Sequence, residues 1–312
     1  MKAIQIESFG DSSVLNYTEV AKPELKPGEV IVRTKAAGVN PIDWKTCSGG
    51  GAAPFIGDLP FIPCWEFSGI VDEVAEDVTA FRPGDEVFGF IRFPEAAGCF
   101  AEYVAAPADE MALKPVNASF AEAAGLGLAG LTAWQALFDK GALQSGQKVV
   151  ILAAAGGVGH LAVQLAKAAG ATVIGTASSG NHLWLQEIGC DQVIDYRTQA
   201  AEEVINDADL VIDGMGGDTG IAALGCLKPG ATLVTLPSVT KDQVIAAATA
   251  AGKQAMPIRV EANGEQLTKL SAAYDQGGLS LELANTYAIT DVAKAFEESK
   301  TGHTKGKLVL TI

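Results

Sequence analysis

The sequence predicts an α/β protein in which a doubly wound parallel sheet is inserted between two segments of a β-rich domain. Short alternating or apolar runs, separated by Gly- and Pro-containing turns, fill the first third of the chain. From Lys148 onward, apolar strands alternate with amphipathic helices, which is the pattern of a parallel sheet covered on both faces. The 312 residues suit two domains of average size, and 48% of them are hydrophobic, enough for two buried cores.

The first β-rich segment contains five expected strands. Turn sequences such as KPELKPGE and FRPGDE lie between them. We expect these strands at residues 3–9, 15–20, 29–39, 68–75 and 85–90.

The pattern changes to helical near Asn117. Ser119 is a plausible N-cap residue, and Glu122 follows three residues later, as in a capping box. Apolar residues then recur at helical spacing at Leu131, Trp134 and Phe138. A helix is therefore expected from about residue 120.

The alternating region predicts five parallel strands with helices between them. We expect strands at 148–154, 171–177, 192–196, 208–215 and 231–238, and helices at 157–170 and 181–189. The remaining chain predicts a helix at 264–276, a strand at 281–289, a helix at 292–299 and a closing strand at 306–312. We accordingly expect a β-rich domain at 1–119, a nucleotide-binding type of domain at 120–256, and a return to the β-rich domain at 257–312.

Composition and charge exclude several classes of partner. The formal net charge of -15 argues against nucleic acid or an anionic membrane surface. The first residues do not resemble a signal peptide, and the apolar runs are too short or too glycine-rich to span a bilayer. The five cysteines are scattered without CxxC spacing, so we expect reduced thiols and a cytoplasmic protein.

A glycine loop lies between the expected strand at 148–154 and the helix that follows it. Gly156 and Gly159 match the second and third glycines of GxGxxG, and Ala154 stands where the first would be. A dinucleotide-binding turn needs backbone that can approach a pyrophosphate and helix amides that face it. The alternative is a tight turn that binds nothing, and the strand–turn–helix context favours nucleotide binding.

The end of the second strand indicates which nucleotide is bound. An NAD site usually has an acid there, about 20 residues beyond the loop, to hold the ribose hydroxyls. This chain has Ser178, Ser179 and His182 instead, and hydroxyls with an imidazole suit a 2′-phosphate. The alternative is a merely polar loop, since no lysine or arginine accompanies the serines. NADP(H) is favoured.

A family resemblance extends over essentially the whole chain. In order, the chain contains AAGVNPIDWK, SGIVDEVAEDV, FRPGDEVFGF, FAEYV, AGLTAWQAL, AAAGGVGHLAVQLAK, VIDYR, VIDGMGGD, LKPGATLVTL and GHTKGKLVLTI. Together these motifs resemble the zinc-independent, quinone oxidoreductase-like branch of the medium-chain dehydrogenases/reductases. The resemblance implies a GroES-like catalytic domain with a Rossmann domain, an NADPH cofactor, and a homodimer formed by extending the Rossmann sheet at its edge.

The resemblance also implies cofactor-binding positions, which fall into four groups. Asn40 and Thr132 match positions that line the nicotinamide. The others match contacts to pyrophosphate (Gly156, Gly157, Val158), to the adenosine phosphate (Ser178, Ser179, Tyr196), and to the nicotinamide ribose and diphosphate (Met215, Gly216, Leu236, Pro237, Lys307). For Tyr196 the alternative is an ordinary aromatic at a strand end, and for Lys307 a solvated lysine.

Zinc-using relatives have metal ligands at three positions where this chain does not. Their Cys, His and Cys correspond to Asn40, Trp65 and Leu128, and those side chains cannot form a catalytic zinc site. Cys47 and Cys64 are expected to be small buried hydrophobes. No metal is therefore expected.

Without zinc, the favoured chemistry is hydride transfer from NADPH to a carbonyl compound already activated by conjugation, such as a quinone or an enone. Asn40 and Asp43 are expected to shape the site, with Asp43 alternatively a local cap residue. Lys45 is a candidate proton donor or orienting group, and an exposed lysine is the alternative. Water is another possible proton source.

A second function class remains open at this point. The chain has no Tyr-x-x-x-Lys pair, HExxH, GxSxG or Walker motif, so other enzyme classes leave no trace. It could instead be a non-catalytic NADPH-binding redox regulator or structural partner. The expected substrate loops, 47–63 and 91–99, carry no charge pattern that identifies an acceptor.

Overall fold

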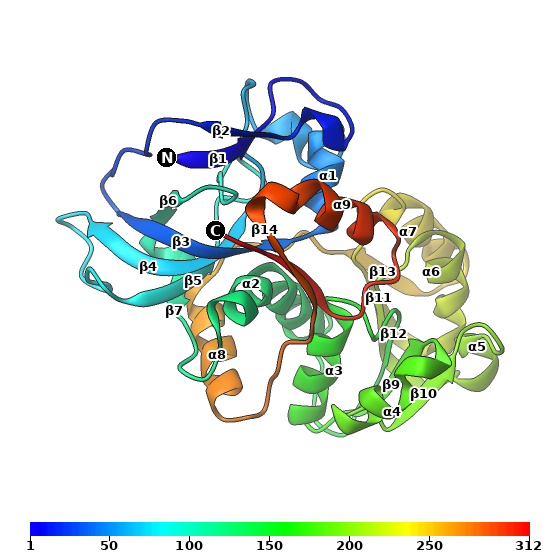
Figure 1. Ribbon diagram of the computed structural model, residues 1–312. Helices are drawn as coiled ribbons and strands as arrows, with labels where there is room; N and C mark the ends of the chain where they lie inside the picture. Colours follow the sequence, from blue (N-terminus) through cyan, green and yellow to red (C-terminus); the bar gives the residue numbers. More distant parts are fainter. The chain divides into compact units, whose positions relative to one another are not determined.

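Two separate β-sheets organise the chain (Figure 1), in a computed structural model that describes residues 1–312. The seven-stranded sheet belongs to a unit that we call the β-rich unit, formed by Met1–Leu131, Glu261–Gly277 and Leu281–Ile312. The six-stranded sheet belongs to the parallel-sheet unit, formed by Thr132–Val260 and Gly278–Ser280. Both sheets and both units agree with the predicted α/β fold class.

The strands of the β-rich unit are mostly antiparallel. Their order is β14 (Leu283–Ala288), β15 (Lys307–Thr311), β3 (Glu29–Val39), β4 (Glu66–Val74), β5 (Glu86–Phe90) and β7 (Met111–Leu113), and β6 (Tyr103–Pro107) also pairs with β3. A separate ribbon is formed by β1 (Lys2–Gln5) and β2 (Asn16–Glu19).

The last strand of the chain closes onto an early one. β15 lies antiparallel to β3, with Leu308 opposite Val39, so the last strand of the chain and residues 29–39 share one sheet (Figure 1). Around this sheet lie α1 (Pro41–Cys47), α2 (Phe120–Trp134), α8 (Gly264–Asp275) and α9 (Val292–Lys300). The largest fully buried side chains of the unit are aromatic, and include Trp65, Phe67, Phe88, Phe90, Phe100 and Phe296. These rings supply much of its apolar burial.

The six-stranded sheet is parallel throughout. Its order is β10 (Gln192–Asp195), β9 (Thr172–Ala177), β8 (Lys148–Ile151), β11 (Ala208–Asp213), β12 (Leu227–Thr235) and β13 (Gln254–Pro257). The chain forms β8 first and then adds β9 and β10 on one side of it. It then crosses over and adds β11, β12 and β13 on the other side. This reversal defines a topological switch point next to β8, and the doubly wound prediction is confirmed.

Helices connect the parallel strands, as the alternating pattern predicts. They are α3 (Gly159–Ala168), α4 (His182–Glu187), α5 (Ala201–Val204), α6 (Gly217–Ala223) and α7 (Lys241–Ala250), and a π-helical segment (Gln135–Lys140) follows α2. The central strands are buried on both faces, since Val149, Val150 and Ile151 are all inaccessible to solvent. No helix in either unit has the length and apolar character needed to cross a membrane.

The division between the units falls inside α2. We expected it at 119/120, where the sequence pattern changes, whereas the structure places it between Leu131 and Thr132. The physical reason is that α2 uses its glycines to pack on the β-rich unit. A Cβ on Gly125 would lie 3.3 Å from the Lys307 Cβ, and one on Gly127 would lie 3.1 Å from the Gly89 carbonyl oxygen.

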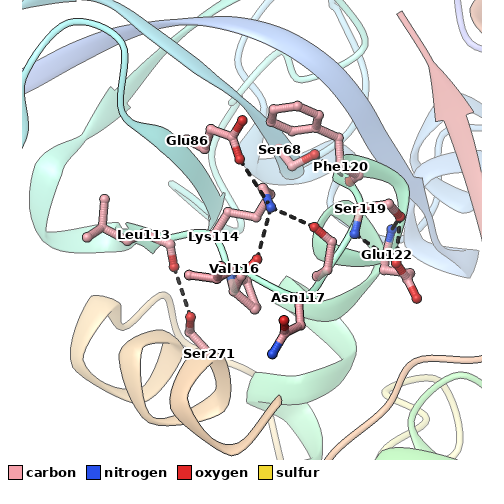
Figure 2. Close-up of polar contacts among 12 residues, drawn as sticks. Ser68, Glu86, Leu113, Lys114, Val116, Asn117, Ser119, Phe120, Glu122 and Ser271 are labelled. Atoms are coloured by element: carbon pink, nitrogen blue, oxygen red, sulfur yellow. Dashed lines mark hydrogen bonds and ion pairs between the residues drawn. The ribbon is translucent and has the colours of Figure 1, made fainter. Parts of the chain in front are cut away.

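The start of α2 is held by a set of polar contacts around a buried lysine (Figure 2). The Lys114 Nζ donates to the carbonyl oxygens of Pro115 at 2.9 Å and Ala118 at 2.6 Å, and lies 3.2 Å from Glu86 Oε2. The predicted capping box is confirmed, because the Ser119 amide donates to Glu122 and the Glu122 amide donates to the Ser119 hydroxyl. Lys114 therefore organises the turn that leads into the helix.

We predict that Lys114→Met lowers the free energy of unfolding by about 3 kcal/mol, because two buried carbonyl oxygens lose their donor. Urea denaturation of the purified protein measures this change.

Glu86→Gln is the control for the ion pair alone. The Glu86 side chain is half exposed, so its removal should cost less than about 1 kcal/mol. Equal losses for the two variants would mean that the ion pair, rather than the two main-chain bonds, stabilises the turn.

Candidate functional site

The glycine loop joins β8 to α3 at the carboxyl edge of the parallel sheet. Ala153 in this turn has a φ of +52°. Of the glycines at positions 156 and 159, Gly159 leaves the least space for a side chain. A Cβ on Gly159 would lie 2.3 Å from the Ala153 carbonyl oxygen, whereas one on Gly156 would lie 3.3 Å from the same atom. Gly159 therefore permits the close approach of helix and strand, as the third glycine of the motif is expected to do.

Ala154 replaces the first glycine of the motif, and the neighbouring strand makes room for it. Its side chain is fully buried, and a Cβ on Gly175 in β9 would lie only 2.8 Å from the Ala154 Cβ. The missing glycine is thus compensated by a glycine on the adjacent strand. This relation cannot be seen without the pairing of β8 with β9.

His160 stabilises the glycine loop through hydrogen bonds. It lies in the first turn of α3, is fully buried, and its Nδ1 is 2.9 Å from the Gly156 carbonyl oxygen, which also accepts from the His160 amide at 3.1 Å. The ring nitrogen must carry a proton to make this bond. His160 therefore has a structural partner on the loop itself.

Ser178 and Ser179 follow β9, next to the end of β10. Asp195, the last residue of β10, lies beside Ala177 and accepts from the amides of Ser179 at 3.2 Å and Arg197 at 3.0 Å. The guanidinium of Arg197 lies over the ring of Tyr196, which is exposed. His182 starts α4, and its Nε2 is 3.3 Å from the Ala177 carbonyl oxygen.

Arg197 is a cation that sequence reasoning missed. The serine loop itself contains no lysine or arginine, whereas this arginine follows the adjacent parallel strand. The βα alternation in the sequence could have identified Arg197, because it predicts parallel strands, and the carboxyl ends of neighbouring parallel strands lie side by side. Asp195, the acid at the same edge, already accepts two backbone hydrogen bonds and shapes the turn.

A buried aspartate organises the next two strand ends. Asp213 Oδ1 accepts from the amides of Met215 at 2.9 Å and Gly216 at 2.8 Å, and Oδ2 accepts from the Thr235 hydroxyl at 2.8 Å. Gly216 has a φ of +68°, and a Cβ there would lie 2.1 Å from Thr240 Oγ1. Asp213 is not among the residues predicted from the sequence.

These contacts bring many of the predicted residues to one edge of one sheet. Met215 and Gly216 follow β11, and Leu236 and Pro237 follow β12, whose end is tied to β11 by a bond from the Leu236 amide to the Asp213 carbonyl oxygen at 2.9 Å. The glycine loop and the serine loop follow β8 and β9 at the same edge. In open parallel sheets, this edge at the switch point is where ligands bind.

The β-rich unit contains a second cluster, made of Asn40, Glu66 and Lys307. The Asn40 Nδ2 donates to Glu66 Oε1 at 2.7 Å, and the Lys307 Nζ donates to Asn40 Oδ1 at 2.5 Å, to Glu66 Oε1 at 2.9 Å and to the Val39 carbonyl oxygen at 3.3 Å. All three side chains are buried. Lys307 is therefore not the solvated lysine considered as an alternative.

The strand register explains why these three residues meet. Asn40 directly follows β3, Lys307 begins β15, which is antiparallel to β3, and Glu66 begins β4 on the other side of β3. Gly38 leaves space for the Glu66 carboxylate, because a Cβ there would lie 2.0 Å from Oε1. The second oxygen of Glu66 accepts from the Leu128 amide at 2.7 Å.

Asp43 lies at the start of α1 and is fully buried. Its Oδ2 accepts from the Asn40 amide at 2.7 Å, as expected for a cap residue, while its Oδ1 has no hydrogen-bond partner. The pKa of this carboxyl is raised from 3.8 to about 8, chiefly by burial; the Asn40 amide lowers it, the charge of Glu66 raises it, and the charge of Lys307 lowers it. The neutral acid is therefore favoured near neutral pH.

The next residues of α1 are Trp44 and Lys45. The Trp44 Nε1 donates to the Ser299 hydroxyl at 3.2 Å, and the Lys45 ammonium lies 5.3 Å from the centre of the Trp44 ring. Lys45 is half-buried rather than exposed, and burial lowers the pKa of its ammonium. Thr132, near the end of α2, is buried.

The positions that bear zinc ligands in metal-using relatives have other contacts here. The Trp65 Nε1 donates to the Glu95 carbonyl oxygen at 2.5 Å, and Leu128 contributes the amide that binds Glu66. Cys47 and Cys64 are buried free thiols, as expected, and burial raises the pKa of Cys47 to about 12. No three His, Cys, Asp or Glu side chains are grouped as metal ligands.

A cavity of about 470 Å³ lies elsewhere in the β-rich unit, lined in part by Met1, Lys26, Ile62, Arg92 and Tyr103. Its arginine, Arg92, is partly buried, and it is already paired with Glu29 at 2.5 Å and bonded to the Ala105 carbonyl oxygen. None of the predicted catalytic or cofactor-binding residues lines it, whereas Ile62, Arg92 and Gly98 belong to the expected substrate loops.

Two family models match the chain. Residues 26–116 match the alcohol dehydrogenase GroES-like domain, and residues 188–310 match a model described as zinc-binding dehydrogenase. The first match covers most of the antiparallel sheet, and the second runs from within the parallel-sheet unit into β15.

Relatives cover nearly the whole chain. The chain is 35% identical to the 2-methylene-furan-3-one reductase of Solanum lycopersicum, and the match covers 99% of this chain and 79% of the relative. The quinone oxidoreductase from Coxiella burnetii superposes with a TM-score of 0.94 at 39% identity, covering 100% of this chain and 99% of the other. The Escherichia coli quinone oxidoreductase, solved as a complex with NADPH, superposes with a TM-score of 0.85 at 26% identity, with 100% of both chains covered. The chain therefore belongs to the quinone oxidoreductase-like family of the medium-chain dehydrogenases/reductases.

Proposed function

We propose that the chain is an NADPH-dependent reductase that transfers hydride to a quinone or another α,β-unsaturated carbonyl compound without a metal ion. The observation that carries the proposal is the ligand-binding edge of the parallel sheet, where the glycine loop, the serine loop and the Asp213 turn meet. Relatives named as reductases of conjugated ketones and quinones support the substrate class.

The residues at this edge fit a dinucleotide. Gly159 and Gly216 are buried where a Cβ would clash with the protein itself, so they fix the shape of their loops. The backbone of Gly156 and Gly157 in the first loop is partly accessible and can approach a pyrophosphate. We assign the pyrophosphate to Ala154, Gly156, Gly157 and Val158, the adenosine phosphate to Ser178, Ser179, His182, Tyr196 and the added Arg197, and the nicotinamide end to Asn40, Thr132, Met215, Gly216, Leu236 and Pro237. When bound, the reduced nicotinamide supplies the hydride.

Acceptor activation is assigned to Asn40, Asp43 and Lys45. Negative charge develops on the carbonyl oxygen of a conjugated acceptor during hydride transfer, and a positioned N–H stabilises it. Lys45 is our candidate proton donor, since burial lowers the pKa of its ammonium and makes it a stronger acid. Asn40, Trp65 and Leu128 support metal independence, because these side chains do not bind zinc as Cys and His do.

We further propose a cytoplasmic homodimer. The outer edge of β13 is unpaired within the chain, so a second copy can extend the parallel sheet there. The non-catalytic alternative, an NADPH-binding redox regulator, is separated from the enzyme by turnover: it would bind NADPH and reduce nothing.

We expect NADPH to be oxidised in the presence of a small quinone or a small enone, and the rate to survive dialysis against a chelator. The loss of reduced-nicotinamide absorbance measures both. NADPH binding without turnover on a panel of quinones, enals and enones would support the regulator instead, and activity that chelation removes and zinc restores would refute metal independence.

We predict that NADPH binds more tightly than NADH, and that Arg197→Met reduces this preference by about 10- to 100-fold, because a charged donor to the 2′-phosphate is lost. Dissociation constants for both nucleotides, measured by calorimetry, test this.

Arg82→Met is the matched control, since Arg82 is an exposed arginine of the other unit, whose side chain pairs with Asp85. A loss of affinity for NADH as large as that for NADPH would contradict the assignment of Arg197 to the 2′-phosphate.

We predict that Asp43→Asn becomes progressively more stable than the wild type as the pH rises from about 4 to about 8. In this window the unfolded chain releases the Asp43 proton and the folded chain keeps it, so the wild type loses about 1.4 kcal/mol of stability per pH unit from this group. Below about 4 both states are protonated, and above about 8 both are ionised. Denaturant titrations at several pH values measure the difference, and a difference independent of pH would mean that the folded protein holds an ionised Asp43.

A further inference from the structure

We propose that Glu66 and Lys307 are positioning residues that hold the Asn40 amide in one orientation, with one N–H kept for the carbonyl oxygen of the acceptor. This inference rests on the proposed reductase function and deepens it. It assigns Lys307 to Asn40 instead of to the cofactor.

The two charges allow only one orientation of the amide. An ammonium faces Asn40 Oδ1 at 2.5 Å, and a carboxylate faces Asn40 Nδ2 at 2.7 Å. Rotating the amide by half a turn would place its NH₂ against the ammonium and its oxygen against the carboxylate. Both contacts would then be repulsive in a buried site, where electrostatic interactions are strong.

Asn40 has an unused N–H group, whereas Lys307 has none. The ammonium has three N–H groups, and the structure gives it three acceptors, on Asn40, Glu66 and Val39. Lys307 therefore has no N–H left for a phosphate. The Asn40 Nδ2 has two hydrogens and uses one of them, toward Glu66, so that one donor remains.

The same contacts strengthen the remaining donor. A cation on the amide oxygen polarises the amide, and a polarised N–H is a better hydrogen-bond donor in a medium of low dielectric constant. The charge of Lys307 is balanced by Glu66, and the second oxygen of Glu66 is bound by the Leu128 amide, so the pair is satisfied without water. A donor held in this way needs no reorganisation when negative charge develops on the acceptor.

The supports lie on strands rather than on mobile loops. Lys307 and Glu66 begin β15 and β4, which flank β3, and Gly38 in β3 makes space for the carboxylate. A site built on a sheet is positioned more accurately than one built on loops.

Lys307→Met tests the proposal, with NADPH affinity, acceptor kinetics and the side-chain amide signal of Asn40 as separate readouts. We expect NADPH to bind as in the wild type. We expect kcat for a small enone to fall about 10- to 100-fold, because the Asn40 amide loses the residue that orients it. The ¹H–¹⁵N signals of the Asn40 amide, assigned by their absence in Asn40→Asp, should shift and exchange faster with solvent. Asn40→Ala, which removes the donor itself, should lower kcat about 10²- to 10³-fold.

Lys114→Met is the matched control, because it makes the same substitution at the other buried lysine of the unit. Its partners are main-chain carbonyl oxygens and Glu86, so it should lower the unfolding midpoint and leave kcat unchanged. If Lys307→Met does not fold because Glu66 is left as an unpaired buried charge, Lys307→Met combined with Glu66→Gln removes both charges and takes its place.

Two outcomes would overturn the proposal. Weaker NADPH binding with unchanged kcat would make Lys307 a cofactor ligand, and an unchanged kcat and amide signal would make the pair purely structural. If the wild type turns over no acceptor, the proposed function fails, and the amide signal alone then decides whether Lys307 and Glu66 hold Asn40.

Discussion

The pairing of β15 with β3 is the interaction on which the arrangement of the β-rich unit depends. It places Lys307 beside Asn40, 267 positions earlier in the chain, and brings both to Glu66 at the start of β4. Taking an ammonium and a carboxylate out of water costs several kcal/mol per ion, and only good geometry and further hydrogen bonds offset that cost. The sheet supplies both, because its register sets the distances and the Val39 carbonyl and Leu128 amide complete the bonding.

The parallel-sheet unit depends on a different constraint, the room that small residues leave near β8. Gly159 allows α3 to start against the Ala153 carbonyl, and Gly175 on β9 accommodates Ala154. Asp213 then fixes the turn after β11 by accepting two backbone amides and a hydroxyl. The local helix or strand preference of the sequence is not what sets the conformation of these loops. Their conformation is set by contacts with neighbouring strands.

Sequence patterns predicted the long, periodic elements and missed what depends on register. The strands at 29–39 and 208–215 and the helix from residue 120 follow from local periodicity. The short elements α1, β6, β7 and β13 carry too few residues to show a period. The burial of Lys307 and the place of Arg197 beside the serine loop each require knowing which strands are neighbours, which a single sequence does not contain.

Two buried lysines in one unit show how partners, rather than burial, separate a structural role from a functional one. Lys114 bonds to two carbonyl oxygens of the turn before α2 and pairs with the half-exposed Glu86 of β5, so its polar contacts hold that turn beside the sheet (Figure 2). Lys307 bonds to a side-chain amide that still has a free N–H. Burying either ammonium group costs free energy, yet only the contact made by Lys307 fixes the orientation of a side chain that, in our proposal, acts on a substrate. The chemistry of a buried charge is therefore determined by what its partner can still do.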